Sequence, residues 1–514
     1  YRLGRIRVFF PYEKMVNGIR PRTPPAVISV TAGGGSDPIA IEPAPVTPKP
    51  SKATVSEAEK AQSSKTGTAS TLLDQNAATG GPVMTQSNEK CFLTIRGQMY
   101  DVSKWADLHP GGGVIRQYHC YDATHIFDAF HSKEAHEKLS TFVPVTNPKV
   151  LAQYAPKPRH PKSEQILESF KQLTERLEAE GLMKLNISWV VYKVLTTLAF
   201  LPLGIFLQYH GWYFLSAISV GVFWQQLGWL GHDFCHHQVF ENRDYNNAMG
   251  YFLGNLCQGT VTRSIVAGFS SAWWKDRHNS HHATTNILDA DPDIDNLPML
   301  AWANSDLDKA SGFVKKTIKY QLFAQAYYFL FLLPVLRLAW CNGSIGFVQA
   351  MRKSNYRAYR EAFTVEASGL ALHWLWVAVM LWKLPTWGTM IMFFLVSELL
   401  AGFGIAIVVF FNHYSCEKYD TNLAGNFVML QLCTTRNMTP GVVTDWICGG
   451  LNYQIEHHLM PTMPRHNLYK ASAYVKEYCK EQGLPYMCDN FYGGLVHVLN
   501  FLNDVGAVAE QRFG

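Results

Sequence analysis

Three groups of histidines carry the chain's most distinctive chemistry. They are His232 and His236, then His278, His281 and His282, then His457 and His458 with Gln454 ahead of them. Residues three or four positions apart share one face of a helix. We therefore expect each group to direct its imidazoles, or the Gln454 amide, toward one point. His237 lies five positions after His232, away from that face, and we interpret it as a bystander.

Seven imidazoles gathered in this way are more than one tetrahedral zinc ion requires. They suit two borderline metal ions, and imidazole-rich sites are compatible with iron. A single histidine pair would more often be structural or lie on an exposed face. Here, however, each of the three groups lies next to an apolar run that is predicted to cross a membrane, as described below, and all three are expected on the same side of that membrane. Together they predict a shared metal centre.

A second set of histidines fits haem ligation. His109 opens the turn His109-Pro110-Gly111-Gly112, and His131 follows it by 22 residues. A haem with two axial histidines needs imidazoles from opposite walls of one apolar pocket. The pocket could be lined by Val114, Ile115, Phe127 and Phe130. From the residues alone, His119, His125 and His136 compete with His131 as the second ligand, and a domain without haem and with surface histidines is the alternative.

The segment around these haem candidates predicts a small α+β domain. Residues 92–102 are rich in β-formers, residues 103–115 contain the turn, and residues 122–140 have a helical pattern. Pro144–Pro161 is expected to be a linker, and Glu164–Glu180 an amphipathic helix. Residues 1–88 are rich in Pro, Ala, Ser and Thr, cannot bury enough apolar surface to fold, and are expected to form a disordered, low-complexity leader.

The rest of the chain contains long apolar runs. Two pairs are each joined by a short link and match the roughly 20 residues that cross a bilayer: Trp189–Leu207 with Trp212–Leu230, and Ala367–Trp382 with Trp387–Phe411. A fifth run, Tyr320–Trp340, contains Gln321, Gln325, Pro334 and Arg337. The histidine groups follow the first and second hairpins, so an even number of crossings must separate them. We therefore expect the fifth run to be interfacial or re-entrant.

These patterns predict a mainly α integral membrane fold of four helices in two hairpins, with a cytosolic cap. The basic segment Arg352–Arg360 then stays on the cytosolic side, as the positive-inside rule prefers. Glu398 lies in the middle of a predicted span, where a carboxylate is costly. We expect it to be neutral and hydrogen-bonded to a neighbouring helix, with a charge pair or a place along a substrate tunnel as the alternatives.

Composition excludes several other classes of protein. The 514 residues are 48% hydrophobic and 17% charged, against about a quarter charged in an average soluble domain. The net charge of +5 is mild and comes without a long basic run, so nucleic acid is not an expected partner. The ten cysteines are scattered singly, which indicates a reduced environment. A Gly-rich nucleotide loop is missing, so we expect no internal nicotinamide site.

The histidine spacings and their context resemble the histidine boxes of membrane fatty acid desaturases. The resemblance includes SAWWKDRHNSHHATTN, DPDIDNLP, TTRNMTPG and GGLNYQIEHHLMPTMPRHNL. Residues 89–165 resemble a cytochrome b5 domain. Gln454 in place of a histidine, together with the fused b5 domain, resembles the front-end class. The expected domains are a leader (1–88), the b5-like domain (89–165), the desaturase domain (166–490) and a C-terminal tail (491–514).

The resemblance also implies ligands and cofactors. His109 and His131 would be the axial ligands of a b-type haem. Two irons would be held by His232, His236, His278, His281, His282, His457 and His458, with Asn412-His413 as a further ligand pair. Gln454 would act more weakly, directly or through a water. O2 would be a co-substrate, and NADH would supply electrons through a separate cytochrome b5 reductase.

The implied activity is insertion of a cis double bond between an existing double bond and the carboxyl end of an acyl chain. The favoured position is Δ6, with Δ5 next, on a CoA- or phospholipid-linked substrate. The implied location is the endoplasmic reticulum membrane, with both termini and the active site in the cytosol. The alternatives are a sphingolipid desaturase or fatty acid hydroxylase on the same metal site, or a membrane-anchored electron carrier with a structural metal site.

Four further features complete the expectations. Thr260–Gly268 lengthens the stretch between the first two histidine groups beyond the family pattern. Asp289, Asp291, Asp293 and Asp295 lack the glycine and glutamate of an EF-hand, so we expect a solvated turn that could hydrogen-bond the histidines. Trp273 and Trp274 are expected to anchor at the membrane interface, with contact to a lipid headgroup as the alternative. His373 is expected to be a hydrogen-bonded core residue.

Overall fold

The structure, a computed structural model, describes residues 90–156, 161–258, 269–309, 321–420 and 426–513. The expected leader and the Thr260–Gly268 insertion lie outside the described residues. The described part is mostly helical, with two small sheets of two strands each. The mainly α fold and the N-terminal α+β domain are therefore confirmed.

The N-terminal domain begins with a hairpin of β1 (Phe92–Ile95) and β2 (Gln98–Asp101). The strands are antiparallel, with Phe92 opposite Asp101. Arg96 and Gly97 both have positive φ (51° and 74°), as a tight two-residue hairpin turn requires. Two 3₁₀ turns (Ala106–Leu108 and Gly112–Tyr118) and helices α3 (Thr124–Phe130) and α4 (Lys133–Ser140) complete the domain.

The expected linker contains a short helix, and the next helix crosses the expected domain boundary. Asn147 caps α5 (Pro148–Tyr154) by accepting a hydrogen bond from the Lys149 amide. Helix α6 (Pro161–Ala179) buries an apolar face and packs against α20 (Leu468–Gln482), where the Tyr478 hydroxyl donates to the Ile166 carbonyl at 2.9 Å. A boundary between residues 165 and 166 would therefore cut through α6.

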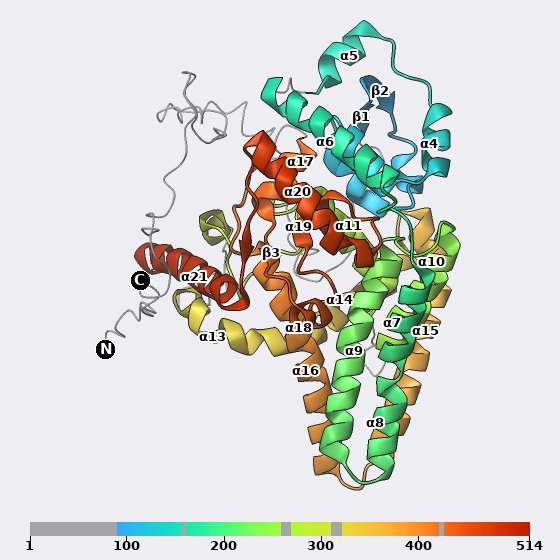
Figure 1. Ribbon diagram of the computed structural model, residues 1–514, viewed down its shortest axis with the longest axis vertical. Coiled ribbons are helices and arrows are strands. Elements are labelled where there is room, and N and C mark those ends of the chain that lie inside the picture. The colour runs from blue at the N-terminus through green and yellow to red at the C-terminus, as the bar shows by residue number, and fades with distance from the viewer. Residues whose placement is uncertain (1–89, 157–160, 259–268, 310–320, 421–425, 514) are drawn as a thin grey trace, which may run out of the picture. The chain divides into compact units, whose positions relative to one another are not determined.

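The apolar runs form a bundle of long helices (Figure 1). Its elements are α7 (Ile187–Leu198), α8 (Phe200–Tyr209), α9 (Tyr213–Cys235), α15 (Arg357–Trp382) and α16 (Trp387–His413). Helices α8 and α9 form one hairpin, and α15 and α16 the other. Buried side chains such as Phe223, Trp224 and Ala401 fill the space between the two hairpins. The two expected hairpins are therefore present.

The described residues contain four helices that are long and apolar enough to cross a membrane: Ile187–Tyr209, Gln325–Met351, Arg357–Trp382 and Trp387–His413. Three of these match expected spans. The fourth, Gln325–Met351, belongs to the fifth run, and the expected span Trp212–Leu230, which forms most of α9, is not among the four. Gln225 and Gln226 make α9 less apolar, and both are satisfied within the protein. The Gln225 side chain donates to the Ile447 carbonyl at 2.7 Å, and Gln226 donates to the Trp446 carbonyl at 3.1 Å.

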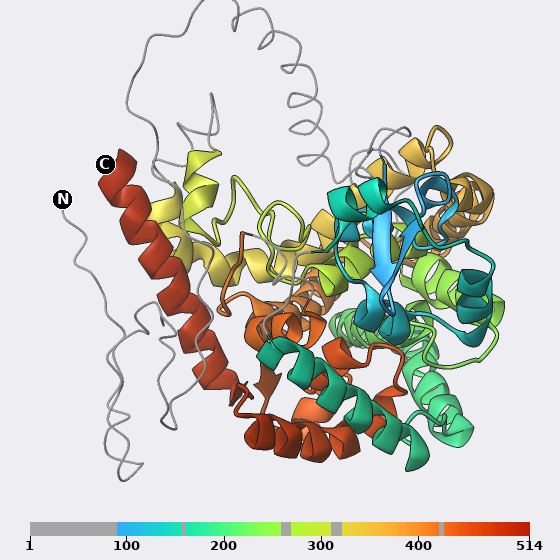
Figure 2. The ribbon, with the colours of Figure 1, turned by 90° about the horizontal axis from the view of Figure 1, so that it is seen from above.

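By length and composition, the fifth run is long and apolar enough to cross a membrane. It forms α13 (Gln325–Leu332) and α14 (Leu336–Met351), joined through a short 3₁₀ turn. Its first part nevertheless runs in another direction. In the side view α13 lies across the bundle axis, and in the view from above it lies in the plane of the picture while α8 and α9 are seen nearly end-on (Figures 1 and 2).

Residues 491–514 were expected to be a C-terminal tail, and this expectation is wrong for the described part. Helix α21 (Phe491–Phe513) buries Val498, Leu502 and Val505. The Gln325 side chain donates to the Leu502 carbonyl at 2.9 Å, which fastens α21 to α13. A regular apolar stripe on a helix supplies the burial that a tail would lack.

The histidine-bearing elements lie beyond one end of the bundle. They are the ends of α9 and α16 together with α11 (Ser271–Ala283) and α19 (Gln454–Leu459). Around them lie α10 (Arg243–Gly250), a π-helical turn (Tyr251–Cys257), α17 (Phe427–Thr434), α18 (Val442–Ile447) and the short parallel strands β3 (Asn437–Met438) and β4 (Cys488–Asp489). All the described residues belong to one compact unit, so the N-terminal domain and these elements are in contact.

Candidate functional site

The histidines from distant parts of the chain meet in two adjacent groups. The first contains His232, His236, His278 and His457, and the second contains His281, His413 and His458. Within each group the candidate ligand atoms lie within 4.8 Å of one another. His282 joins the first group, because its Nε2 lies 3.1 Å from the Nε2 atoms of His278 and His457. His237 is in neither group and contacts Lys275 instead.

Neighbouring histidines are divided between the two groups, which corrects the expectation that each sequence group converges on one point. On α11, His282 faces the first group and His281 the second. On α19, His457 faces the first group and His458 the second. Successive helical residues are rotated by about 100° because a turn takes 3.6 residues. Each of these helices therefore serves two sites at once.

Several imidazole nitrogen atoms of the first group lie close enough to one another to bind the same metal ion. Nε2 of His457 lies 3.1 Å from Nε2 of both His232 and His282. The buried Nε2 atom of His236 has no hydrogen-bond partner within the described part of the chain, and the same is true of Nε2 of His458 in the second group. Lone pairs that face one another at this distance repel unless a proton or a metal ion lies between them. The donor set therefore fits metal ions that prefer imidazole, iron included.

Hydrogen bonds at Nδ1 orient the imidazole rings of the second group. Nδ1 of His281 donates to Asp291 Oδ2 at 2.9 Å, and Nδ1 of His413 donates to the Thr434 carbonyl at 3.1 Å. His458 pairs its Nδ1 with Gln431 Oε1 at 2.8 Å. A proton held on Nδ1 leaves the Nε2 lone pair free, which is the usual arrangement of a metal-bound histidine.

Burial favours the neutral form of most imidazoles in this site, and His281 is the exception. It lowers the pKa of His278, His282 and His458 well below the ordinary value, and the charges of neighbouring imidazoles lower it further. The neutral imidazole is the form that binds metals. For His281, burial alone would lower the pKa, but the charge and hydrogen bond of Asp291, with the charge of Asp293, raise it. Asp291 therefore faces a ring with more cationic character than the others.

Gln454 lies beside the second group. Its side-chain Nε2 is 3.1 Å from His413 Nε2, and its Oε1 accepts a hydrogen bond from Asn412 Nδ2 at 3.1 Å. Asn412 also donates to the Leu451 carbonyl at 2.9 Å. The amide thus replaces an imidazole at the edge of the group, and Asn412 fixes its orientation.

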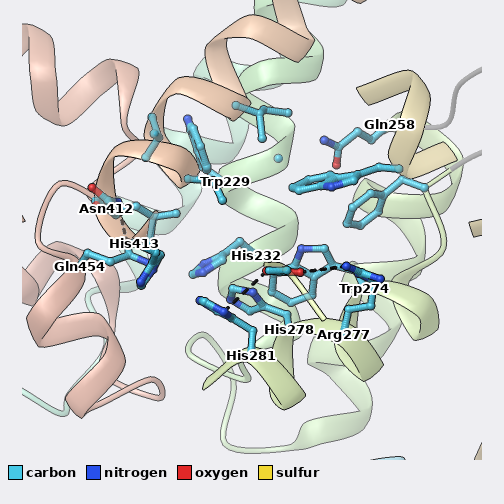
Figure 3. A pocket seen from close by; sticks show the side chains of 18 of the residues that line it. Trp229, His232, Gln258, Trp274, Arg277, His278, His281, Asn412, His413 and Gln454 are labelled. Atoms are coloured by element: carbon cyan, nitrogen blue, oxygen red, sulfur yellow. Dashed lines mark hydrogen bonds and ion pairs between the residues drawn. The ribbon is translucent and has the colours of Figure 1, made fainter. Parts of the chain in front are cut away.

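A narrow cavity of about 60 Å³ opens onto both histidine groups. His232, His278, His281, His413 and Gln454 form its polar wall (Figure 3). The other walls are mostly apolar and are formed mainly by Trp229, Phe269, Trp273, Trp274, Trp340, Ile405, Val408, Val409 and Leu451, with the polar residues Gln258, Arg277, Asp293 and Asn412 among them. An apolar chain in this cavity would lie against the candidate metal ligands with little access for water.

The two haem-ligand candidates face each other in the N-terminal domain. The ring centroids of His109 and His131 are 5.9 Å apart. Nδ1 of His109 donates to the Gly112 carbonyl at 3.2 Å, and Nδ1 of His131 donates to the Phe127 carbonyl at 3.0 Å. Both rings therefore keep Nε2 free for an axial bond, so the pair fits haem. His119 instead accepts a hydrogen bond from the Phe92 amide through Nδ1.

Four other expected features can be compared with the structure. His373 is a hydrogen-bonded core residue as expected, because its Nδ1 donates to the Leu256 carbonyl at 2.9 Å. Glu398 is held by a neighbouring helix as expected, but through an ion pair with Arg337 at 3.0 Å rather than as a neutral acid. The interface role of Trp273 and Trp274 is wrong. Both are buried, and Trp274 stacks on His278 with centroids 4.1 Å apart.

The acidic turn is not fully solvated, because Asp291 is buried. Its hydrogen bond to His281 is the contact that the sequence suggested. Sequence reasoning missed Gln431, which contacts His458 and donates to the His282 carbonyl at 2.8 Å. The available signal was a single amide in the otherwise apolar helix FVMLQLCT.

Comparison with known proteins gives matches over most of the chain. Residues 176–490 match the fatty acid desaturase family, and residues 83–154 match the cytochrome b5-like heme/steroid binding domain. A delta(6)-fatty-acid desaturase of Caenorhabditis elegans is 40% identical over 79% of this chain and 93% of its own length. A delta(5) fatty acid desaturase of the same organism is 41% identical over 83% and 98%. A delta(8)-fatty-acid desaturase of Euglena gracilis is 42% identical over 82% and 96%.

Proposed function

The chain belongs to the fatty acid desaturase family and carries a cytochrome b5-like domain ahead of the desaturase segment, and from this premise we propose that it is a front-end desaturase. It is an oxidoreductase that acts on fatty acyl chains in a lipid environment. The proposed reaction inserts a cis double bond between an existing double bond and the carboxyl end of a polyunsaturated acyl chain. Position Δ6 is favoured and Δ5 is next.

The observation that supports this proposal best is the position of the cavity. One wall presents histidines of both groups, and the other walls are mainly apolar and largely aromatic. This combination suits a substrate whose reacting part is a methylene rather than a polar group. A membrane-anchored electron carrier with a structural metal site would have no use for an apolar cavity beside the metal ligands.

The family implies iron and the b5-like domain implies haem, and the residues fit both groups. We propose that His109 and His131 hold the haem. One iron would be held within the group of His232, His236, His278, His282 and His457, and the other within the group of His281, His413 and His458 beside Gln454. When bound, the irons supply the O2 chemistry that breaks an unactivated methylene C–H bond, which acid and base side chains cannot do.

The chain's own residues prepare the site for that chemistry. Asp291, the Thr434 carbonyl and Gln431 hold a proton on Nδ1 of their histidine partners and so present Nε2 to the metal. Trp274 stacks on His278 and closes the polar wall against water. The apolar side chains on α16 orient the methylenes against the histidine wall.

Electron supply and location complete the proposal. A separate NADH-dependent cytochrome b5 reductase would reduce the haem. Per double bond, two electrons, two protons and two substrate hydrogens would convert one O2 into two waters. The enzyme would lie in the endoplasmic reticulum membrane with its termini and active site in the cytosol. A sphingolipid desaturase or hydroxylase is not favoured, because the three relatives above are named as fatty-acid desaturases.

Product analysis in yeast tests the proposal. Cells expressing the chain are fed linoleate or a longer polyunsaturated acid, and mass spectrometry locates the new double bond. We expect a bond on the carboxyl side of the existing ones, at Δ6 in linoleate. Early sampling of the acyl-CoA and phospholipid pools identifies the substrate form. Hydroxy acids, or altered long-chain bases alone, would contradict the proposal.

A further inference from the structure

One aromatic residue of the N-terminal domain joins the haem-ligand segment to the metal centre. Phe130 immediately precedes His131 in the sequence. In space, its ring meets the ring of His282 edge to face, with centroids 5.8 Å apart and an interplanar angle of 77°. Phe130 therefore has a haem-ligand candidate on one side and a metal-ligand candidate on the other.

Hydrogen bonds on the same segment hold Phe130 in this position. The Arg243 guanidinium donates to the Phe130 carbonyl at 2.7 Å, and the Thr462 hydroxyl donates to the Ala129 carbonyl at 3.4 Å. Arg243 belongs to α10, and Thr462 follows α19, which carries His457 and His458. Elements next to the metal centre thus grip the backbone on which Phe130 sits.

The other haem-ligand loop is docked as well. A Cβ atom at Gly112 would overlap the Tyr359 hydroxyl, so only glycine allows this approach to α15. The Tyr118 hydroxyl donates to the Ala283 carbonyl at 2.9 Å. The two domains therefore contact each other on both sides of the haem-ligand pair, and the Phe130–His282 contact is part of a continuous interface.

We propose that Phe130 is the contact through which electrons pass from the haem to the metal centre, and that Arg243 positions it. This inference rests on the proposed function. In each transfer a haem held by His109 and His131 would give up one electron and become ferric, and one ferric ion held by the histidine groups would take it up and become ferrous. Two transfers supply one turnover, and the NADH-dependent reductase replaces both electrons. Electron tunnelling weakens steeply across empty gaps, and Phe130 offers a filled route because it is bonded through the backbone to His131 and its ring contacts His282.

The chain offers a matched control for Phe130. Phe127 lies on the same helix and stacks on His131 with ring centroids 4.4 Å apart. Its other aromatic contact is His136, in the N-terminal domain. Phe127→Leu therefore disturbs the haem pocket from the same helix without changing the Phe130–His282 contact. Tyr118→Phe tests the competing route through the Ala283 carbonyl, which is next to His282 in the sequence.

The experiment uses the full-length protein, loaded with haem and iron, without O2 and without acyl substrate. The haem is photoreduced, and its reoxidation by the ferric metal centre is followed at the Soret band. We expect Phe130→Leu to slow this transfer about tenfold, with unchanged haem spectrum, haem potential and iron content. Phe130→Tyr should restore the rate and Tyr118→Phe should retain it, whereas any rate change in Phe127→Leu should be accounted for by its measured haem potential. In zinc-loaded protein the haem should stay reduced.

Three results would count against the inference in distinguishable ways. If the unaltered, iron-loaded protein shows no transfer, both the proposed function and this route are wrong. If transfer is normal and Phe130→Leu matches it, the route alone is wrong. If Tyr118→Phe slows transfer and Phe130→Leu does not, the electron passes through the Ala283 side of the interface.

Arg243 has its own test, because a charge near the haem could act on potential rather than position. We expect Arg243→Met to slow the transfer, and the double variant with Phe130→Leu to be no slower than Phe130→Leu alone. Additive losses, or a rate change fully accounted for by the measured haem potential, would overturn the positioning role.

Discussion

Asp291 holds His281 by a hydrogen bond of 2.9 Å between Oδ2 and the imidazole Nδ1. The carboxylate is itself fixed, because Oδ2 also accepts from the Asn286 amide at 2.8 Å and Oδ1 accepts from the Asp293 amide at 2.9 Å. The loop after α11 therefore sets the direction in which the His281 Nε2 points. A change at Asp291 should reach the metal site through one ring.

We predict that Asp291→Asn lowers iron affinity by about 10- to 100-fold, the usual loss when the partner of a ligating histidine is changed. The amide is a weaker acceptor than the carboxylate and no longer favours a proton on Nδ1. Asp295→Asn is the control, because Asp295 is an exposed residue of the same loop. Metal analysis against haem absorbance measures the ratio of iron to haem. Full iron content in Asp291→Asn under limiting iron would contradict this role.

The haem and metal sites should be separable by single substitutions. His457 contacts His232 and His282 at 3.1 Å, so His457→Ala should abolish desaturation and leave the haem spectrum intact. His109→Ala should remove the haem spectrum, because one axial ligand is lost. His237→Ala is the matched control within the first histidine box and should retain both properties. A His457→Ala protein that still forms product would remove His457 from the metal site.

The buried pair of Arg337 and Glu398 should affect stability strongly only when it is broken. The guanidinium Nε lies 3.0 Å from Glu398 Oε2, and both side chains are buried. Glu398→Leu removes the carboxylate that pairs with the buried Arg337 guanidinium and should cost about 3–5 kcal/mol, whereas Arg337→Leu with Glu398→Leu should recover most of the loss. Unfolding of the detergent-solubilised protein measures both changes. Equal losses in the single and double variants would contradict this coupling.

Lys418 should make stability depend on pH. Burial lowers the pKa of its ammonium group from 10.5 to about 7. Between these values the unfolded chain binds more protons than the folded chain, so the free energy of unfolding should rise with pH. Lys418→Met should reduce this rise, measured from about pH 7 to about pH 9.5. Lys480→Met controls for loss of an exposed charge. The same slope in both variants would exclude Lys418 as the cause.

Local patterns were sufficient to predict much of the fold. The β-rich stretch of residues 92–102, the amphipathic helix expected at Glu164–Glu180 and the two helical hairpins follow from periodicity, whereas the turn at Arg96-Gly97 that divides the stretch into two strands was not predicted. Local patterns did not predict that residues 491–513 form a packed helix rather than a tail. The apolar stripe of α21 is buried because α13 supplies the surface that it covers.

The residue types and spacings determined by themselves that histidines from separate segments could form a metal centre and that His109 and His131 could hold a haem. Tertiary structure decided how these ligands are divided. His281 and His282 are neighbours in the chain, yet helical rotation directs them to different groups. It also decided the partners Gln431 and Phe130, because each acts across a contact between segments that the sequence keeps more than a hundred residues apart. Spacing specifies a shared face within one helix, whereas packing between helices specifies what that face meets.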